Sequence, residues 1–385
     1  MKLSKNYVLP IVIQMVCGVN VALAGPTIEY GDNKESSITV GAGLQGSYTN
    51  TDTAIGNTKN SFAVGSARIY LSGNLNKSIS GMLNFDAKAP TPTGGTGEVI
   101  DANVQFKINP NYTVWAGRFL SPSDRANMAG PYYSLGGGYW SSVASRYGYN
   151  GGHIGRDDGV AIEGSALDGM LQFGFGAFNG HTAFNLSGAP AGYTGSSLAS
   201  TYQPMYSGRI QMDFWDAEPG LLYGTGNYLG TKDILAIGIA SRSQKGGATG
   251  STVVGDYKSN SVDFLLEKKG VGPGAISFEA AYYTYDTDGA VLTEQGKAYS
   301  AAMGYIFNQK VGSGDLSGQF QPFIRYQQFK DEETTSLQTK KYDLGIDYIM
   351  KGYNARIAAF YSDTQISQTA KTSSKAFTVT ATVQF

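Results

Sequence analysis

The stretch KAFTVTATVQF at residues 375–385 decides the fold. Its apolar residues Phe377, Val379, Ala381, Val383 and Phe385 alternate with polar ones. Side chains of a β-strand point alternately to its two faces, so this segment has one apolar face and one polar face. In a soluble sheet the apolar face needs a core supplied by other elements, whereas lipid covers it in a transmembrane barrel. A terminal strand of this kind is expected to pair with the first strand and close such a barrel.

The opposite end of the chain has the pattern of an export signal. Lys2 and Lys5 precede an apolar stretch that ends at Ala22-Leu23-Ala24, a small-x-small cleavage site. We expect residues 1–24 to be a cleaved Sec signal peptide and residues 25–385 to be one domain. A membrane-spanning helix fits less well because Pro10 and polar residues interrupt a run that is already short. A lipid anchor on Cys17 is a further alternative.

Composition excludes several classes of function. The chain has 29 basic and 30 acidic residues, so it lacks the excess of positive charge that is typical of nucleic-acid-binding proteins. Cys17 is the only cysteine and lies in the expected signal, so the mature chain has no disulfide or thiol chemistry. We therefore expect no cofactor and no transition-metal site. No stretch after the signal is long and apolar enough for a membrane-spanning helix, so membrane residence requires strands.

Period-two alternation recurs along almost the whole chain. In 339–350, Leu344 and Ile346 share a face, while Asp343 and Asp347 share the other. A helix would place those charges in its apolar stripe. About sixteen segments alternate in this way and are long enough to cross a bilayer as tilted strands: 37–49, 61–76, 79–90, 98–109, 111–120, 156–166, 169–180, 203–216, 231–244, 256–268, 274–286, 296–308, 315–330, 339–350, 353–364 and 375–385. We therefore predict an all-β fold, a transmembrane antiparallel β-barrel of about 16 strands.

The connections between these segments tend to alternate between short and long. Residues 76–78, 109–111, 167–169 and 351–352 are tight turns, whereas the longer connections are polar. Outer-membrane barrels have short turns on the periplasmic side and longer loops outside. The connection 217–230, AEPGLLYGTGNYLG, is long where a short turn is due. Either this turn is elaborated or the strand count is wrong by one hairpin.

Several motifs resemble the phosphate-selective porin O/P family of Gram-negative outer-membrane porins. They cover most of the chain after the signal and include WAGRFLSPSDRANMAGPYY (115–133), GRDDGVAIEG (155–164), GRIQMDFWDAEPG (208–220), QPFIRYQQF (321–329) and GIDYIMKGYNARIAAFYS (345–362). The resemblance implies a sixteen-stranded, usually trimeric, diffusion channel, with phosphate selectivity in its best-known members. It also implies that Phe385 is the C-terminal signal read by the barrel-assembly machinery.

The longest connection, 121–155, is the third external loop in this count. In sixteen-stranded porins that loop folds into the barrel and narrows it, and we expect the same here. Arg125, Arg146 and Arg156 lie in or beside the loop and Arg118 precedes it, which makes them candidates for the pore constriction. Whether the loop folds inward or lies on the outer rim stays open at this point.

Ion selectivity is less clear because inward-facing charges are mixed. Arg68, Lys107, Arg118, Arg209, Arg325 and Arg356 are further cationic candidates, opposed by Asp86, Asp101, Asp213, Glu279, Asp343 and Asp347. A wall arginine paired to a carboxylate on a neighbouring strand is the more ordinary arrangement. We expect a passive channel for small hydrophilic solutes and ions, with a weak anion bias at the constriction and no dedicated phosphate selectivity.

Two other classes of function stay open. A barrel that sheathes or anchors another exported protein would need a lumen without an inward loop. A barrel hydrolase could use His153 with Asp157 or Asp158, but no Ser-His-acid set follows from the spacing. The other histidine, His181, looks like a solvated loop residue. We therefore expect no enzymatic activity, and we expect as partners small solutes or anions, outer-membrane lipid and two further copies of the chain.

Overall fold

The fold is seen in a computed structural model of the chain. The structure describes residues 25–31, 34–52, 56–87, 97–130, 132–137, 143–145, 155–180, 203–248, 254–290, 295–332, 337–368 and 370–385. The expected signal peptide lies outside these ranges. Within them, no helix is long and apolar enough to span a membrane.

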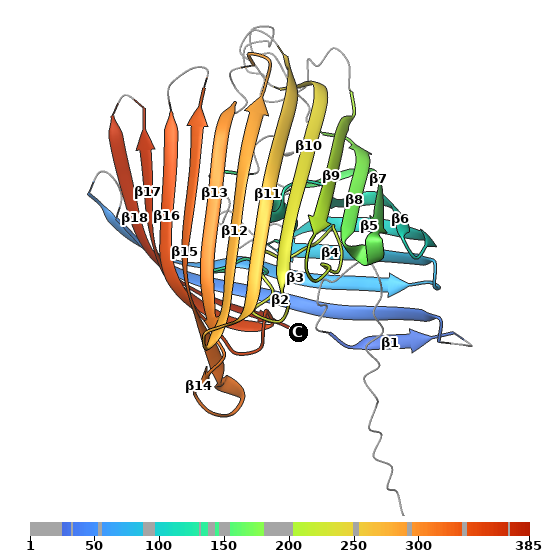
Figure 1. The fold of residues 1–385 in the computed structure, drawn as a ribbon, viewed down its shortest axis with the longest axis horizontal. Helices are drawn as coiled ribbons and strands as arrows, with labels where there is room; N and C mark the ends of the chain where they lie inside the picture. Colours follow the sequence, from blue (N-terminus) through green and yellow to red (C-terminus); the bar gives the residue numbers. More distant parts are fainter. Residues whose placement is uncertain are drawn as a thin grey trace, which may run out of the picture.

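The described chain forms one antiparallel sheet of eighteen strands (Figure 1). Two strands are short additions: β1 (Thr27–Tyr30) pairs with β2, and β14 (Lys310–Val311) pairs with β15. The other sixteen form the ring: β2 (Ser36–Asp52), β3 (Thr58–Asn74), β4 (Ile79–Ala87), β5 (Gly97–Asn109), β6 (Tyr112–Leu120), β7 (Arg156–Ala166), β8 (Leu171–Phe178), β9 (Met205–Asp213), β10 (Ile234–Ala248), β11 (Gly255–Val271), β12 (Gly274–Asp286), β13 (Gly296–Phe307), β15 (Gly318–Asp331), β16 (Gln338–Ile349), β17 (Ala355–Ser367) and β18 (Lys371–Gln384). Each of the sixteen predicted segments corresponds to one of these strands. The strand prediction is therefore confirmed.

The last strand closes the ring on the first. β18 pairs with β2 from Lys375↔Asp52 to Gln384↔Gly43. The terminal residue completes this ladder, since the Phe385 N–H donates to the Ala42 carbonyl oxygen at 2.9 Å and its carbonyl oxygen accepts from the Ala42 N–H at 2.6 Å. The strand at 375–385 therefore leaves no open sheet edge, as the sequence predicts.

The two faces of the wall differ in the way that a membrane requires. On β16, Leu344 is 64% exposed and Ile346 is exposed too, whereas Asp343 and Asp347, on either side of this pair, are buried. The same alternation holds on β15, where Ile324 is exposed and Arg325 is buried. The exterior is thus apolar and the interior polar, which is the arrangement of an outer-membrane barrel facing lipid.

The connection between β9 and β10 explains the break in the loop pattern. All strands are antiparallel neighbours, so connections lie alternately at the two rims. The β9–β10 connection, 214–233, lies at the same rim as the short turns at 75–78, 110–111 and 350–354. The strand count is correct and this turn is elaborated. The short helices all lie in connections between strands. Helix α1 (Arg125–Met128) belongs to the β6–β7 connection, the 3₁₀ helix η1 (Leu167–Gly169) lies between β7 and β8, and η3 (Gly314–Leu316) lies between β14 and β15.

Candidate functional site: the lumen

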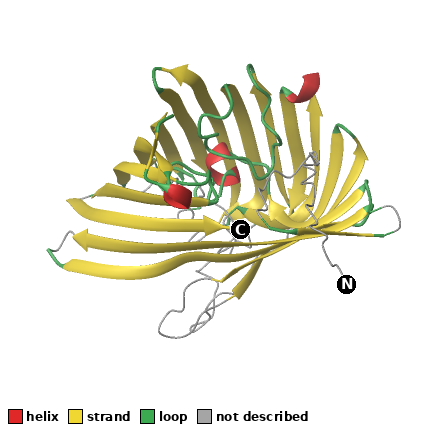
Figure 2. Cartoon of the chain, turned by 90° about the horizontal axis from the view of Figure 1, so that it is seen from below, coloured by secondary structure: helices red, strands yellow, loops and turns green. Residues whose placement is uncertain are grey.

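The described part of the β6–β7 connection lies inside the barrel. We call this part, residues 121–130, 132–137 and 143–145, the inward loop. The Gly136 N–H donates to Asp347 Oδ2 on β16 at 3.0 Å, and the Leu135 carbonyl oxygen accepts from Arg325 Nη1 on β15 at 2.8 Å. Both wall side chains belong to the buried, interior face. Figure 2 shows loops and a short helix within the ring of strands. The described part of the predicted inward loop is therefore inside.

The inward loop approaches the wall too closely for larger residues at one position. Gly136 has φ +80°, and a Cβ there would lie 2.6 Å from the Phe323 ring. Glycine meets both demands because it has no Cβ and tolerates positive φ. The loop backbone can therefore come close enough to the wall to form hydrogen bonds with Asp347 and Arg325.

Helix α1 places an arginine at the middle of the lumen's polar network. The Asp124 carboxylate caps the helix by accepting from the Asn127 N–H at 3.1 Å. The backbone N–H of Arg125 donates to Asp263 Oδ2 on β11 at 3.1 Å, which fixes the helix to the wall. The Arg125 side chain is only 4% exposed.

Arg125 forms a bidentate salt bridge with Glu218 of the β9–β10 turn. Its Nη2 and Nη1 lie 2.5 and 2.7 Å from Glu218 Oε1 and Oε2, and its Nε lies 3.6 Å from Asp263 Oδ1. Burial alone would lower the pKa of Arg125, but the charge and hydrogen bonds of Glu218 and the charge of Asp263 raise it above its ordinary value. The guanidinium therefore stays charged.

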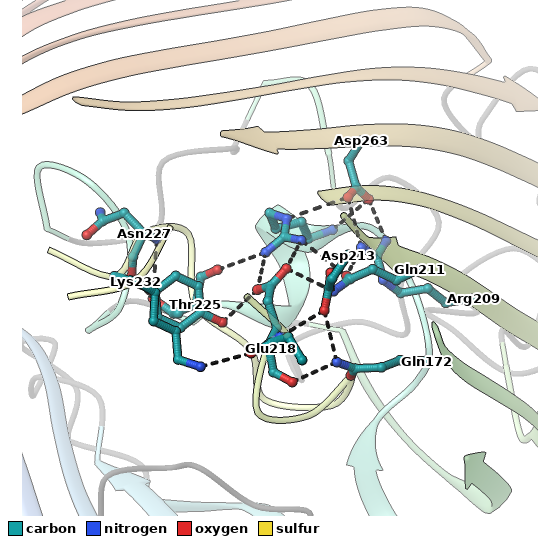
Figure 3. Close-up of polar contacts among 12 residues, drawn as sticks. Gln172, Arg209, Gln211, Asp213, Glu218, Thr225, Asn227, Lys232 and Asp263 are labelled. Atoms are coloured by element: carbon teal, nitrogen blue, oxygen red, sulfur yellow. Dashed lines mark hydrogen bonds and ion pairs between the residues drawn. The ribbon is translucent and has the colours of Figure 1, made fainter. Parts of the chain in front are cut away.

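Glu218 is held in place by residues of the adjacent strands β8 and β9 and by a tyrosine of its own turn (Figure 3). Its N–H donates to Asp213 Oδ2 at 2.8 Å, and its carbonyl oxygen accepts from Gln172 Nε2 at 2.7 Å. Gln211 Nε2 and the Tyr228 hydroxyl donate to its carboxylate at 2.8 and 2.6 Å. Burial and the nearby Glu218 carboxylate raise the pKa of Tyr228 well above its ordinary value, so the phenol remains a donor.

A second arginine completes this group. Arg209 on β9 makes two bonds to Asp263, at 2.5 and 2.8 Å, and donates to the Ser123 carbonyl oxygen of the inward loop at 3.1 Å. Arg125, Arg209, Gln211, Glu218 and Asp263 thus form one buried network, which we call the lumenal cluster. It joins two strands, the inward loop and the β9–β10 turn.

Two further interior arginines are paired with carboxylates on neighbouring strands. Arg68 on β3 bonds its register partner Asp86 on β4 at 2.8 Å, and Arg325 on β15 bonds its partner Asp343 on β16 at 3.0 Å. The guanidinium of Arg68 lies 5.4 Å from the ring centroid of Tyr132 in the inward loop. Cross-strand pairing is the ordinary arrangement that the sequence favours, and it is what these residues adopt.

Arg156 has a partner on another strand. Its Nε lies 2.8 Å from Asp101 Oδ1 on β5, and both side chains are buried. The same carboxylate oxygen accepts from the Tyr223 hydroxyl at 2.6 Å, so the β9–β10 turn reaches this pair too. Lys107 lies farther along β5, half-buried and in register with Thr113.

Arg118 differs from the other candidates because it lies on the exterior face. Its register partners are Ala102, which is exposed like the following Val104, and Asp158. Directly opposed residues of a ladder share a face. Arg118 makes two bonds to Asp158, at 2.6 and 2.8 Å. The expectation that it faces the pore is corrected: the alternation of β6 turns it away from the lumen.

The position of Arg118 gives the first testable prediction. Because its charge lies outside the wall and is neutralised by Asp158, Arg118→Ala should leave both the conductance and the ion selectivity of the barrel unchanged. Reversal potentials of wild type and variant in the same salt gradient would measure this. A shifted reversal potential in the variant would place the guanidinium in the ion path.

Some candidates lie outside the described residues. These are Arg146, His153 and His181. Of the proposed hydrolase acids, Asp157 accepts from the N–H groups of Asp158 and Gly180, and Asp158 bonds Arg118. Among the residues that the structure describes, no group of three or more His, Cys, Asp or Glu has the spacing of a metal site.

Sequence reasoning missed the partners that hold the network together. Glu218 and Tyr223 lie in a turn whose only signal was its unexpected length. Asp263 lies in a predicted strand, but its link to Arg125 spans 138 residues. Glu163, which accepts from Trp115 and from the Leu221 N–H, was likewise not singled out.

Comparison with solved structures identifies the architecture. The chain is similar to the anion-selective porin from Comamonas acidovorans, with a TM-score of 0.60, 12% identity, and coverage of 91% of this chain and 100% of that one. It is similar to Salmonella typhi OmpF in complex with daunomycin (TM-score 0.58, 14% identity, 93% and 100% coverage) and to the trimer form of Vibrio cholerae OmpT (TM-score 0.54, 13% identity, 91% and 100% coverage). No protein-family model and no curated protein matches the chain.

These likenesses establish the fold. It is the closed sixteen-stranded barrel of outer-membrane porins, and together with the apolar exterior it is the architecture of a multi-pass protein of the Gram-negative outer membrane. At these identities the comparisons do not single out the phosphate-selective porin O/P family that the motifs resemble.

Proposed function

We propose that this protein is an outer-membrane porin, a water-filled channel for passive diffusion of small hydrophilic solutes and ions. The observation that carries this proposal is the combination of a closed sixteen-stranded ring with a polar, ion-paired interior. A ring of this size is too wide for wall side chains to fill, and in porins it encloses an aqueous path. The described part of the inward loop narrows that path from within.

The finer question is ion selectivity. The sequence predicts a weak anion bias, and the resemblance to the phosphate-selective family raises the further hypothesis that the channel prefers phosphate. The buried charges of the described interior weigh against both. The buried arginines are seven, Arg68, Arg125, Arg156, Arg209, Arg242, Arg325 and Arg356, against twelve buried acids, Asp86, Asp101, Asp124, Asp157, Glu163, Asp213, Glu218, Asp263, Glu267, Glu279, Asp343 and Asp347. Rings of cationic side chains select anions, and an acidic lining favours cations.

Reversal potentials test this point directly. In planar bilayers under a KCl gradient, we expect stable open steps with a modest preference for K⁺, and we expect added phosphate to leave the current unchanged. The reason is that the interior arginines Arg68, Arg209 and Arg325 are engaged with carboxylates.

The matched variants for this measurement are Arg146→Ala and Arg118→Ala. Arg146 is the sequence candidate outside the described residues, and Arg118 is the exterior control. A Cl⁻ preference with phosphate block that Arg146→Ala relieves would show that the anion bias is correct. It would also overturn the cation preference inferred from the described lining.

Assembly completes the proposal. We propose export by the signal at 1–24, insertion by the barrel-assembly machinery through the terminal strand ending at Phe385, and association into a homotrimer in outer-membrane lipid. The trimer form of the similar Vibrio cholerae OmpT supports the last point. The described part of the inward loop weighs against a sheath function, because a sheath needs a cleared lumen.

A further inference from the structure

The β9–β10 turn crosses the lumen instead of staying at its rim. Tyr223 bonds Asp101 on β5, and Leu221 donates to Glu163 on β7 at 3.0 Å. Farther along the turn, the Tyr228 N–H donates to Glu267 on β11 at 2.7 Å. In the ring, β11 lies well away from β5 and β7. The turn therefore spans from one part of the wall to another.

A third anchor lies on yet another part of the wall. Tyr353 belongs to the turn between β16 and β17. Its hydroxyl lies 2.9 Å from both the Thr225 hydroxyl and Asn227 Oδ1 of the β9–β10 turn. The three anchors surround the axis of the barrel, so the segment between them occupies its interior.

The β9–β10 turn also meets the inward loop. The paired bridge between Glu218 and Arg125 is one junction. The second is formed by the Gly226 N–H and the Thr225 hydroxyl, which both donate to the Tyr133 carbonyl oxygen, at 3.1 and 3.0 Å. The two connections start from opposite rims, because β6–β7 and β9–β10 lie at opposite ends of an antiparallel ring.

We propose that residues 214–233 are a second constriction element, which together with the inward loop forms a two-part partition of the lumen. The path is then bounded by segments from both rims, which meet at the Arg125–Glu218 bridge and at Tyr133. The size limit for solutes is then set by the β9–β10 turn as much as by the inward loop. This inference rests on the proposed channel function.

Shortening the turn tests the inference. The ladder of β9 and β10 continues to Asp216 and Asp233, whose backbones are bonded at 2.9 Å. Residues 217–232 can therefore be replaced by Asn-Gly, which forms a two-residue hairpin turn. We expect the single-channel conductance to rise about twofold or more, since the lining and width of the pore set passage. Larger neutral sugars should also enter liposomes that contain the variant.

The matched control shortens a turn at the same rim that does not enter the lumen. Residues 312–317 between β14 and β15 are exposed, apart from a half-buried Ser317, and can be replaced by Asn-Gly in the same way. This control should keep wild-type conductance. If the 217–232 variant is folded, as shown by heat-modifiable migration, and also conducts like wild type, the inference is wrong while the channel function stands. If wild type and variant are both silent, the channel function fails and the inference with it.

A disulfide tests the contact independently of conduction. A Cβ at Gly226 would lie 3.6 Å from the Cα of Ser134, which brings a disulfide within reach once the Glu279 carboxylate, 2.9 Å from that Cβ, shifts aside. We expect the double variant Gly226→Cys, Ser134→Cys to form an intramolecular disulfide on oxidation in the folded protein, while each single variant keeps one titratable thiol. Two titratable thiols in the folded, oxidised double variant would contradict the partition, whatever the conductance.

Discussion

Leu344→Arg should lower the free energy of unfolding of the membrane-inserted barrel by about 2–4 kcal/mol, the cost of arginine on the lipid face of a strand near the bilayer midplane. Leu344 lies near the middle of β16 and is 64% exposed. In a water-soluble protein, a charge at such an exposed site changes stability little. The sign and size of this effect therefore distinguish lipid from water as the solvent of the exterior.

The measurement is denaturant unfolding of protein refolded into lipid vesicles. Leu316→Arg is the matched control, because Leu316 is 70% exposed in the turn η3, outside the ring. We expect the control to unfold like wild type. Equal stability of both variants would contradict a lipid-facing position for Leu344.

Arg125→Leu should have the second large effect. Removing one partner of a buried ion pair costs about 3–5 kcal/mol, because the remaining charge is left buried and uncompensated. Here Glu218 would lose its two bonds to Arg125 while keeping those from Gln211 and Tyr228. We expect the inward loop and the β9–β10 turn to separate, seen as faster proteolysis of both and as noisier open-channel current.

Two comparisons make this result specific. Replacing both Arg125 and Glu218 by leucine should recover part of the loss, since apolar residues can substitute for a buried pair. Arg118→Leu breaks a more exposed pair at the rim, near the end of β6 and the start of β7, and should cost about 1 kcal/mol or less. If Arg125→Leu proves no worse than Arg118→Leu, the Arg125–Glu218 bridge does not hold the partition together.

The strands could be predicted from the sequence because the signal is local. Period-two alternation follows from backbone geometry and lipid on one side, as with Leu344 and Asp343 on β16. The closing role of the terminal strand follows from the same alternation, and β18 pairs with β2 as expected. The elaborated turn at 217–230 was recognised by its length alone.

The site could be predicted only in part, because several of its interacting residues are far apart in the sequence and come together only when the ring of strands closes. Arg68 and Arg325 pair with register neighbours, which alternation and hairpin order can suggest. Arg125 instead meets Glu218 and Asp263, residues far along the chain that only the folded ring brings together. For Arg118 the position predicted from the sequence was wrong. Its proximity to the loop suggested that it faces the pore, whereas the alternation of β6 places its side chain on the exterior face.

Single-channel recording from purified, heat-modifiable protein in planar bilayers tests the central claim most directly. The account predicts stable open steps from the wild-type protein, with larger steps when residues 217–232 are replaced by Asn-Gly. The absence of conductance from both proteins, each shown to be folded, would contradict a diffusion channel in this barrel.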